Sequence, residues 1–203
     1  MILLASASPR RKSLLGQLVK EFDILPADID ETPLLNEKAE DYVKRMALEK
    51  AKAASLLSCQ SALPAPNRAI IIGSDTSVVL DGIILGKPES FEQALSMLRL
   101  LSGKTHQVMT SVCLYDTRHE HIAVKNVVTE VSFRRISDLE IKQYWQSGEP
   151  QDKAGSYGIQ GLGSIFVEQI SGSYSAVVGL PMFETAQLLQ EVGIMPLQEI
   201  SGE

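Results

Sequence analysis

The sequence predicts an α/β protein in which helices flank a mixed β-sheet, arranged as two lobes with a central cleft. Three observations lead to this prediction. Short apolar strands alternate with helices, capping residues mark where several helices begin, and turn residues join neighbouring strands as hairpins. The alternation continues along the whole chain, so residues 1–203 are interpreted as a single domain.

The first part of the chain is predicted to contain two strands and two helices. Residues 2–5 are apolar and read as a short strand, and Ser8 then begins a helix that runs to about residue 19. Residues 22–25 are predicted to form the second strand. Asn36 is the expected N-cap of a long helix over residues 37–58.

The middle of the chain is predicted to be mostly β-structure. A loop rich in proline and polar residues over 60–68 precedes a buried strand over 69–74. Residues 78–85 are expected to form a hairpin, because Asp81-Gly82 is a dipeptide that a type I′ turn favours.

Two further helices are marked by serine caps. Ser90 and Gln93 have the spacing of a capping box, and this helix is expected to stop at Gly103. Ser137 and Glu140 have the same spacing at the start of a helix that ends by residue 148. The remaining predicted elements are strands at 107–115, 121–133 and 165–170, a glycine-rich segment at 155–163, and a last helix at 182–192.

Composition excludes several classes of protein. With 44% hydrophobic and 22% charged residues, the chain has the balance of a folded globular protein rather than a disordered one. Its apolar runs are too short to cross a membrane, and the N-terminal apolar run precedes the first cations, which is the reverse of an export signal. A net charge of −6 and 5% aromatic residues argue against a general nucleic-acid binder. We therefore expect a cytoplasmic protein.

The start of the first helix has an unusual charge pattern. Ser8 and Pro9 suit the N-cap and the first helical position, but Arg10, Arg11 and Lys12 follow directly. Each exposed cation at this end interacts unfavourably with the helix dipole, at a cost of about 0.3–1 kcal/mol. A bound phosphate would remove the conflict, and a solvated basic turn is the alternative interpretation.

Lys50 falls on the apolar face of the long helix. That face is formed at helical spacing by Ala39, Val43, Met46, Ala47, Ala54 and Leu57. Steps of about 100° per residue place Lys50 near the centre of this face. A lysine directed at the core must either extend its ammonium group to solvent or meet an anion, which would be a bound ligand or the carboxylate of a structural ion pair.

Two acidic residues and a lysine complete the candidate site. Asp75 follows the strand over 69–74 and is expected at its carboxyl end, where open α/β sheets place ligands. Together with Glu31 it would offer hard oxygen ligands for a divalent cation, although an Asp here is also a common turn residue. Lys87 is held extended by Pro88 and would reach a phosphate as a point charge, unless it is simply a surface lysine.

A series of short motifs, taken in order, resembles the Maf family of nucleotide pyrophosphatases over nearly the whole chain. The motifs are Leu-Ala-Ser-Ala-Ser-Pro-Arg-Arg at 4–11, Asp-Glu-Thr-Pro at 30–33, Glu-Lys-Ala at 49–51, Gly-Ser-Asp-Thr at 73–76, Gly-Lys-Pro at 86–88, Leu-Ser-Gly-Lys-Thr-His-Gln-Val-Met-Thr at 101–110, Asp-Lys-Ala-Gly-Ser-Tyr-Gly-Ile-Gln-Gly at 152–161 and Val-Gly-Leu-Pro at 178–181. Each motif alone is weak, and their order makes the resemblance specific. It implies a two-lobed fold related to the inosine-triphosphate pyrophosphatases.

The resemblance also implies residue roles. It implies hydrolysis between the α and β phosphates with a divalent cation, Mg²⁺ or Mn²⁺. By motif position, Asp75 would be the base or the metal-bound carboxylate that activates water, and Glu31 would be its metal partner. The residues that would hold the triphosphate are Ser8, Arg11, Lys50, Lys87 and Lys153.

Three positions resemble the branch of the family that acts on dTTP and UTP. They are Arg10, Thr76 and Gln160. A glutamine offers both a donor and an acceptor to the O4 and N3–H of a pyrimidine, and Arg10 would repel a cationic methylated base.

The sequence thus predicts an enzyme that converts a pyrimidine nucleoside triphosphate into a monophosphate and pyrophosphate. Its partner would be the nucleotide, without a stable nucleic-acid complex or a membrane, and a homodimer is left open. Two alternatives stand beside this prediction. One is a pyrophosphatase for a purine or modified purine triphosphate, and the other is a non-catalytic, nucleotide-sensing regulator of cell division.

Overall fold

The computed structural model describes residues 1–60 and 68–197, so the predicted loop over 60–68 lies almost entirely outside the described residues. The chain divides into two compact units. Within the described residues, the first unit is built from residues up to Asp75, from Thr110–Val127 and from Gly179 onward. The second unit contains Thr76–Met109 and Val128–Val178. This division agrees with the two predicted lobes, and the central cleft stays a prediction.

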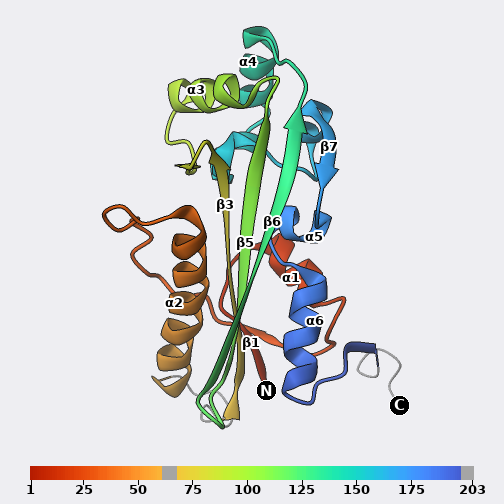
Figure 1. The fold of residues 1–203 in the computed structure, drawn as a ribbon. Helices are drawn as coiled ribbons and strands as arrows, with labels where there is room; N and C mark the ends of the chain where they lie inside the picture. The colour runs from red at the N-terminus through yellow and green to blue at the C-terminus, as the bar shows by residue number, and fades with distance from the viewer. Residues whose placement is uncertain (61–67, 198–203) are drawn as a thin grey trace. The chain divides into compact units, whose positions relative to one another are not determined.

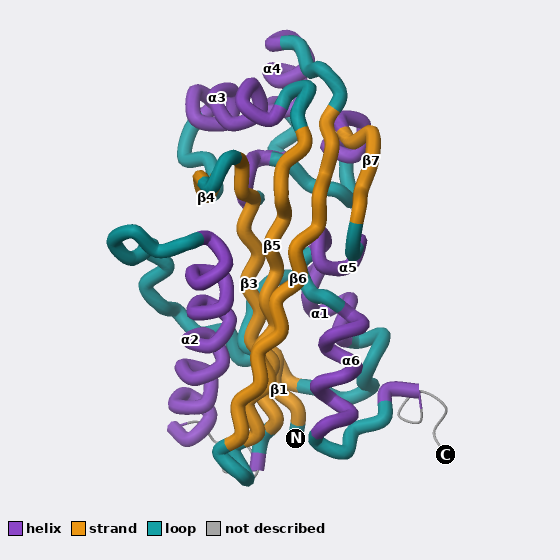
Figure 2. The backbone as a smooth tube through the Cα atoms, in the orientation of Figure 1, coloured by secondary structure: helices purple, strands orange, loops and turns teal. Residues whose placement is uncertain are grey.

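The sheet is mixed, as the sequence predicts. Its strand order is β2-β1-β3-β5-β6-β7, with β4 paired to β3. Figure 2 shows β3, β5 and β6 side by side in this order. Strand β1 runs parallel to β2 and β3, whereas the β3–β4 and β6–β7 pairs are antiparallel. The strands are β1 (Ile2–Leu4), β2 (Asp23–Ile24), β3 (Ile70–Leu80), β4 (Ile83–Leu85), β5 (Thr105–Asp116), β6 (His121–Phe133) and β7 (Val167–Ser171).

Six α-helices are assigned in the described residues. They are α1 (Pro9–Leu15), α2 (Ala39–Gln60), α3 (Phe91–Leu101), α4 (Asp138–Gln146), α5 (Tyr174–Val178) and α6 (Met182–Glu191). The glycine-rich segment forms short 3-10 helices at Glu149–Asp152, Ala154–Ser156 and Leu162–Phe166. In the first unit, α2 lies on one side of the strands and α1 and α6 lie on the other (Figure 1). None of the helices in the described residues is both long and apolar enough to cross a membrane.

The two units have different cores. In the first unit, small residues of α2 pack against β1 and β3, and this cluster includes Leu3, Ala47, Ala51, Ala54 and Ile71. In the second unit, the core contains aromatic rings in edge-to-face contact. Phe133 packs on Tyr157 with ring centroids 4.7 Å apart, and Tyr144 packs on Phe166 at 5.1 Å. Small side chains let a helix approach a sheet closely, which matters for the site.

Several local predictions are confirmed. Ser137 and Glu140 form the complete capping box of α4. The hairpin turn has φ values of 51° at Asp81 and 80° at Gly82, as a type I′ turn requires.

Two helix starts differ from the prediction. Ser90 caps α3 by accepting from the Gln93 backbone N–H, but the Gln93 side chain accepts from Glu89 instead of completing the box. Asn36 is not the N-cap of α2, because it has a φ of 59° and the helix begins only at Ala39. The side chain of Glu37 accepts from the Leu34 N–H, so this segment forms a turn before the helix starts.

Asp75 does not lie at the carboxyl end of a strand. Strand β3 continues through it to Leu80, because the residues after Asp75 are almost all buried and include two valines that favour extended backbone. On this strand, Ile70–Ile72 pair with β1 and Val78–Leu80 pair with β4. Asp75 therefore lies between the segments that pair with these two different neighbours.

Candidate active site

A glycine in β3 sets the distance between this strand and α2. A Cβ atom at Gly73 would lie 2.2 Å from the Ala47 carbonyl oxygen and 2.9 Å from the Ala51 backbone nitrogen. Such contacts are too short for any side chain, so α2 can approach β3 this closely only because residue 73 is a glycine. Lys50 lies between Ala47 and Ala51 on the helix, and Asp75 lies two residues beyond Gly73 on the strand. The close contact therefore brings the lysine to the aspartate.

Lys50 connects two carboxylates. Its Nζ donates to Asp75 Oδ1 at 2.7 Å and lies 2.6 Å from Glu31 Oε1. Only 9% of Lys50 and 7% of Asp75 are exposed, whereas the side chain of Glu31 is 46% exposed. The predicted inward direction of Lys50 is confirmed, and its partners are the two predicted acidic residues. The three groups together carry a net charge of −1, with one end of the cluster open to solvent.

Tyr42 holds the backbone that carries Glu31. Its buried hydroxyl donates to the Glu31 carbonyl oxygen at 2.9 Å. Burial raises the pKa of Tyr42 to about 12, and the negative charges of Asp75 and Glu31 add to this effect. Tyr42 therefore stays protonated and keeps its donor at neutral pH.

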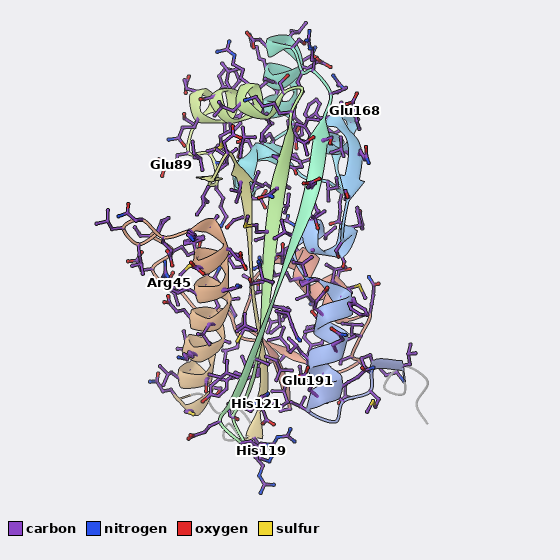
Figure 3. All side chains as sticks on the ribbon, in the orientation of Figure 1. Arg45, Glu89, His119, His121, Glu168 and Glu191 are labelled. Carbon is purple, nitrogen blue, oxygen red and sulfur yellow. The ribbon has the colours of Figure 1, made fainter. Side chains whose placement is uncertain are left out.

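Arg45 ties the same loop to α2 from the other side. Its Nε and Nη2 each donate to one oxygen of Glu37 at 2.7 Å, and Nη2 also donates to the Thr32 carbonyl oxygen at 3.1 Å (Arg45 is labelled in Figure 3). The hydrogen bonds from Arg45 lower the pKa of Glu37 to about 2. A bidentate contact of this kind fixes orientation as well as distance. The segment before α2 is thus fastened at Glu31 itself and at Thr32 and Glu37, which follow it.

Arg11 belongs to the same electrostatic environment. Burial lowers its pKa, the charge of Asp75 opposes that change, Arg10 lowers the pKa further, and Glu31 opposes it. Arg11 thus interacts with both carboxylates of the Lys50 cluster. Because an arginine stays charged even after a substantial shift, it remains a cation here.

The backbone around α1 orients Arg11. Its Nε donates to the Gly179 carbonyl oxygen at 2.9 Å, and its Nη1 donates to Ser6 Oγ at 3.3 Å. The same Gly179 oxygen accepts from Ser74 Oγ at 3.0 Å. Ser8 is the N-cap of α1, as predicted, and accepts from the Arg11 N–H at 3.4 Å. Ser74 precedes Asp75, so this network links the Arg11 guanidinium to the strand that carries the aspartate.

The other predicted site residues lie in the second unit. Thr76 is half-buried on β3, and Lys87 and Gln160 are exposed. Lys153 Nζ donates to the Glu149 carbonyl oxygen at 2.7 Å and to Asp152 Oδ1 at 2.6 Å. The Gly155 N–H donates to the Gly86 carbonyl oxygen at 3.0 Å, which joins the segments that carry Lys87 and Lys153. In the second unit this backbone hydrogen bond is the observed connection between the segments of Lys87 and Lys153.

The donor set of the first unit fits a divalent cation that is held largely by a polyphosphate. Glu31 and Asp75 each direct one oxygen at the same cationic atom, so these oxygens lie within two hydrogen-bond lengths of each other. Among the described residues, no group of three or more His, Cys, Asp or Glu side chains is placed to hold a metal ion. Two carboxylates with the remaining ligands from phosphate and water are typical of Mg²⁺ in nucleotide enzymes.

Sequence reasoning missed the residues that support this cluster. The signal for Gly73 was present, since a glycine inside a buried strand often marks the close approach of another backbone. Tyr42 and Arg45 gave no local signal, because their partners are a main-chain carbonyl and a side chain in a turn. Gly179 is also found only in the structure, since its carbonyl oxygen meets Arg11 across 168 positions of sequence.

Comparison with known proteins assigns the chain to a family. A protein from Vibrio parahaemolyticus is 54% identical over 190 residues, which covers 94% of this chain and 96% of that protein. One from Colwellia psychrerythraea is 50% identical over 196 residues, covering 96% and 89% respectively. Both relatives are named dTTP/UTP pyrophosphatase. Among solved structures, the Staphylococcus aureus Ham1 protein matches with a TM-score of 0.48 and 15% identity over 98% of this chain and 92% of that one. The family of Maf-like proteins matches residues 1–192, and the chain belongs to this family.

Proposed function

We propose that this protein hydrolyses pyrimidine nucleoside triphosphates, dTTP and UTP, to the nucleoside monophosphate and pyrophosphate. The observation that carries the proposal is the buried Lys50 Nζ held between Glu31 and Asp75. A lysine and two carboxylates that meet at the edge of solvent suit a chelated polyanion, since each charge in the cluster then has a counterpart in the ligand. The curated relatives at about half identity, which are named for dTTP and UTP, support the substrate class.

The chemistry would be an in-line attack of water on the α phosphorus. Asp75 takes a proton from the water, the bond between the α phosphorus and the bridging oxygen breaks, and pyrophosphate leaves. A divalent cation bound by Glu31 and Asp75, Mg²⁺ or Mn²⁺, would neutralise phosphate charge and make the bound water more acidic. With such a cation held by Glu31 and Asp75, Lys50 would be available to contact phosphate.

The cationic residues would bind the phosphates. Arg11 suits a bidentate contact with a phosphate, and Ser8 lies at the start of the same helix. From the family resemblance, Lys87 and Lys153 are assigned to the same task. Arg10, Thr76 and Gln160 are assigned to the choice of base.

Product analysis tests the proposal. The purified protein is incubated with Mg²⁺ or Mn²⁺ and, separately, UTP, dTTP, CTP and GTP, and the products are separated by ion exchange. We expect monophosphate and pyrophosphate in equal amounts, formed faster from UTP and dTTP than from CTP and GTP. Release of orthophosphate and a nucleoside diphosphate would reject the bond assignment. Preference for GTP would favour the purine alternative.

A further inference from the structure

Glu149 forms a hydrogen-bonded centre in the second unit, outside the residues assigned above. Its Oε1 accepts from Tyr144 Oη at 2.7 Å and from the Gly163 N–H at 3.0 Å, and its Oε2 accepts from the Leu162 N–H at 2.7 Å. Burial raises the pKa of Glu149, but the hydrogen bonds from Gly163, Tyr144 and Leu162 outweigh this and leave the pKa below its ordinary value. Glu149 is therefore ionised at neutral pH, and the charge strengthens all three hydrogen bonds.

The same centre holds both ends of one glycine-rich segment, residues 158–163. Tyr144 Oη accepts from the Gly158 N–H at 3.1 Å, while Glu149 accepts from residues 162 and 163. The segment lies directly against these two side chains. A Cβ atom at Gly161 would be 2.2 Å from Glu149 Oε2, and one at Gly163 would be 2.6 Å from Tyr144 Oη. The glycines therefore allow the contact, and the two side chains fix the path of the backbone.

Gln160 lies between the two fastened ends of this segment and is exposed. A glutamine can read the edge of a base only if its backbone is held at a constant distance, since a loose loop loses part of the binding free energy to ordering. We infer that Glu149, assisted by Tyr144, is a positioning residue that fixes Gln160 for recognition of the base. This inference rests on the proposed function, because the choice of base is part of that function.

The connection to Lys153 separates this role from phosphate binding. Lys153 Nζ donates to the main-chain carbonyl oxygen of Glu149, at 2.7 Å, and not to its carboxylate. A change confined to the Glu149 side chain leaves this hydrogen bond in place and removes only the charge interaction between its carboxylate and Lys153. The variant should therefore alter the preference among bases more than the overall binding of the triphosphate.

Glu149→Gln is the test variant. The amide keeps the size of the side chain but has only one acceptor atom, so its NH₂ group faces one of the backbone N–H donors. The ratio of kcat/KM for UTP to that for GTP should fall on the order of tenfold. The reason is that a more mobile segment can move aside and accommodate the larger purine base. Amide hydrogen exchange of residues 158–163, measured without nucleotide, should become faster.

Two further variants complete the design. Tyr144→Phe removes the acceptor for Gly158 and should change the ratio in the same direction. Glu168→Gln makes the same chemical change at an exposed glutamate of β7 in the same unit and should leave the ratio and the exchange at the wild-type values (Glu168 is labelled in Figure 3).

The outcomes distinguish this inference from the proposed function. Two results for Glu149→Gln would overturn the inference and leave the proposed function standing. One is faster exchange with an unchanged ratio of kcat/KM for UTP to that for GTP, and the other is unchanged exchange. A wild-type protein that forms no monophosphate and pyrophosphate from UTP or dTTP would overturn the proposed function first. A lower ratio in both Glu149→Gln and Tyr144→Phe, with faster exchange, supports the inference.

Discussion

Asp75 and Glu149 are two carboxylates that are stabilised in different ways. Asp75 is buried against a cation, the Lys50 ammonium, and shares it with Glu31. Glu149 is held by neutral donors, two backbone N–H groups and a tyrosine hydroxyl. A cation that balances a carboxylate can be replaced by another cation, whereas backbone donors are fixed to the fold. The first arrangement suits a group that takes part in chemistry, and the second suits a group that supports a loop.

The largest effect is expected from Asp75→Asn. The amide cannot accept a proton from water and is a weaker metal ligand, so the rate of pyrophosphate release should fall about a thousandfold or more. Lys50 still has Glu31 as a partner, so the fold should persist. Pyrophosphate assays give the rate and circular dichroism gives the fold. A rate near the wild-type value would show that Asp75 has no chemical role.

Lys50→Met tests whether the cation is exchangeable. If Lys50 met only a bound phosphate, its removal would leave stability unchanged or raise it, because an unpaired inward charge would be gone. The structure changes that expectation, because Lys50 is paired and its loss leaves Asp75 buried beside Glu31. The free energy of unfolding should fall by about 3 kcal/mol, as for other broken buried pairs.

Added Mg²⁺ should restore part of this loss in the Lys50→Met variant and stabilise the wild type less. Urea unfolding with and without Mg²⁺ measures both effects. Equal effects of Mg²⁺ on the two proteins would argue against a metal position between the carboxylates.

Gly73→Ala tests the close contact that brings the two charges together. The new methyl group would overlap the Ala47 carbonyl oxygen, so α2 must shift, at a cost of about 1–3 kcal/mol in the free energy of unfolding. Gly86→Ala is the control, since a Cβ atom there meets nothing within 4 Å. Comparable losses in the two variants would mean that the helix contact at Gly73 does not matter.

His106 should make the stability of the protein depend on pH. It is buried in the second unit, its Nε2 lies 2.8 Å from Tyr157 Oη, and burial lowers its pKa from 6.5 to about 4. Below pH 6.5 the unfolded chain binds a proton that the folded protein does not bind until about pH 4. The contribution of His106 to the free energy of unfolding is therefore greatest above pH 6.5. It decreases as the pH falls, by about 2 kcal/mol between pH 7 and pH 5.

The His106→Gln variant isolates that contribution. Its side chain does not titrate, so its loss of stability between pH 7 and pH 5 should be smaller than that of the wild type by about the same 2 kcal/mol. Urea midpoints at the two pH values measure the difference. An identical decrease in both proteins would assign the pH dependence to other groups.

The smallest effect is expected from Tyr42→Phe. The change removes the hydrogen bond to the Glu31 carbonyl oxygen and leaves the ring in place. Loss of one hydrogen bond of about 1 kcal/mol should reduce kcat/KM for UTP severalfold. Tyr115→Phe, a half-buried tyrosine of β5, is the matched control. A kcat/KM equal to that of the control would show that Glu31 needs no support from Tyr42.

Much of the fold could be predicted from the sequence because its signals are local. The capping box at Ser137, the turn at Asp81-Gly82 and the inward face of α2 each depend on residues close together in the chain. On that face the prediction was wrong only for Leu57, which is exposed. The end of the strand before Asp75 was placed wrongly, since nothing local distinguishes two strands from one strand that changes partners.

The candidate site was predicted in part for a related reason. Charged residues in apolar surroundings, such as Lys50, stand out in a sequence. The groups that hold these charged side chains in place do not stand out, because they act through main-chain atoms. The Gly179 carbonyl oxygen that holds Arg11 and the backbone N–H groups that hold Glu149 are present in any sequence, and only the fold selects them.

The contact at Gly73 has a consequence for engineering. Helix α2 and strand β3 lie too close together for a methyl group at residue 73. The absence of a Cβ atom there therefore determines how closely Lys50 approaches Asp75. Redesign of this scaffold for another polyphosphate must retain glycine at this position or lengthen the cationic side chain on the helix. The absence of a side chain at residue 73 thus contributes to the geometry of the proposed active site as much as the Lys50 and Asp75 side chains do.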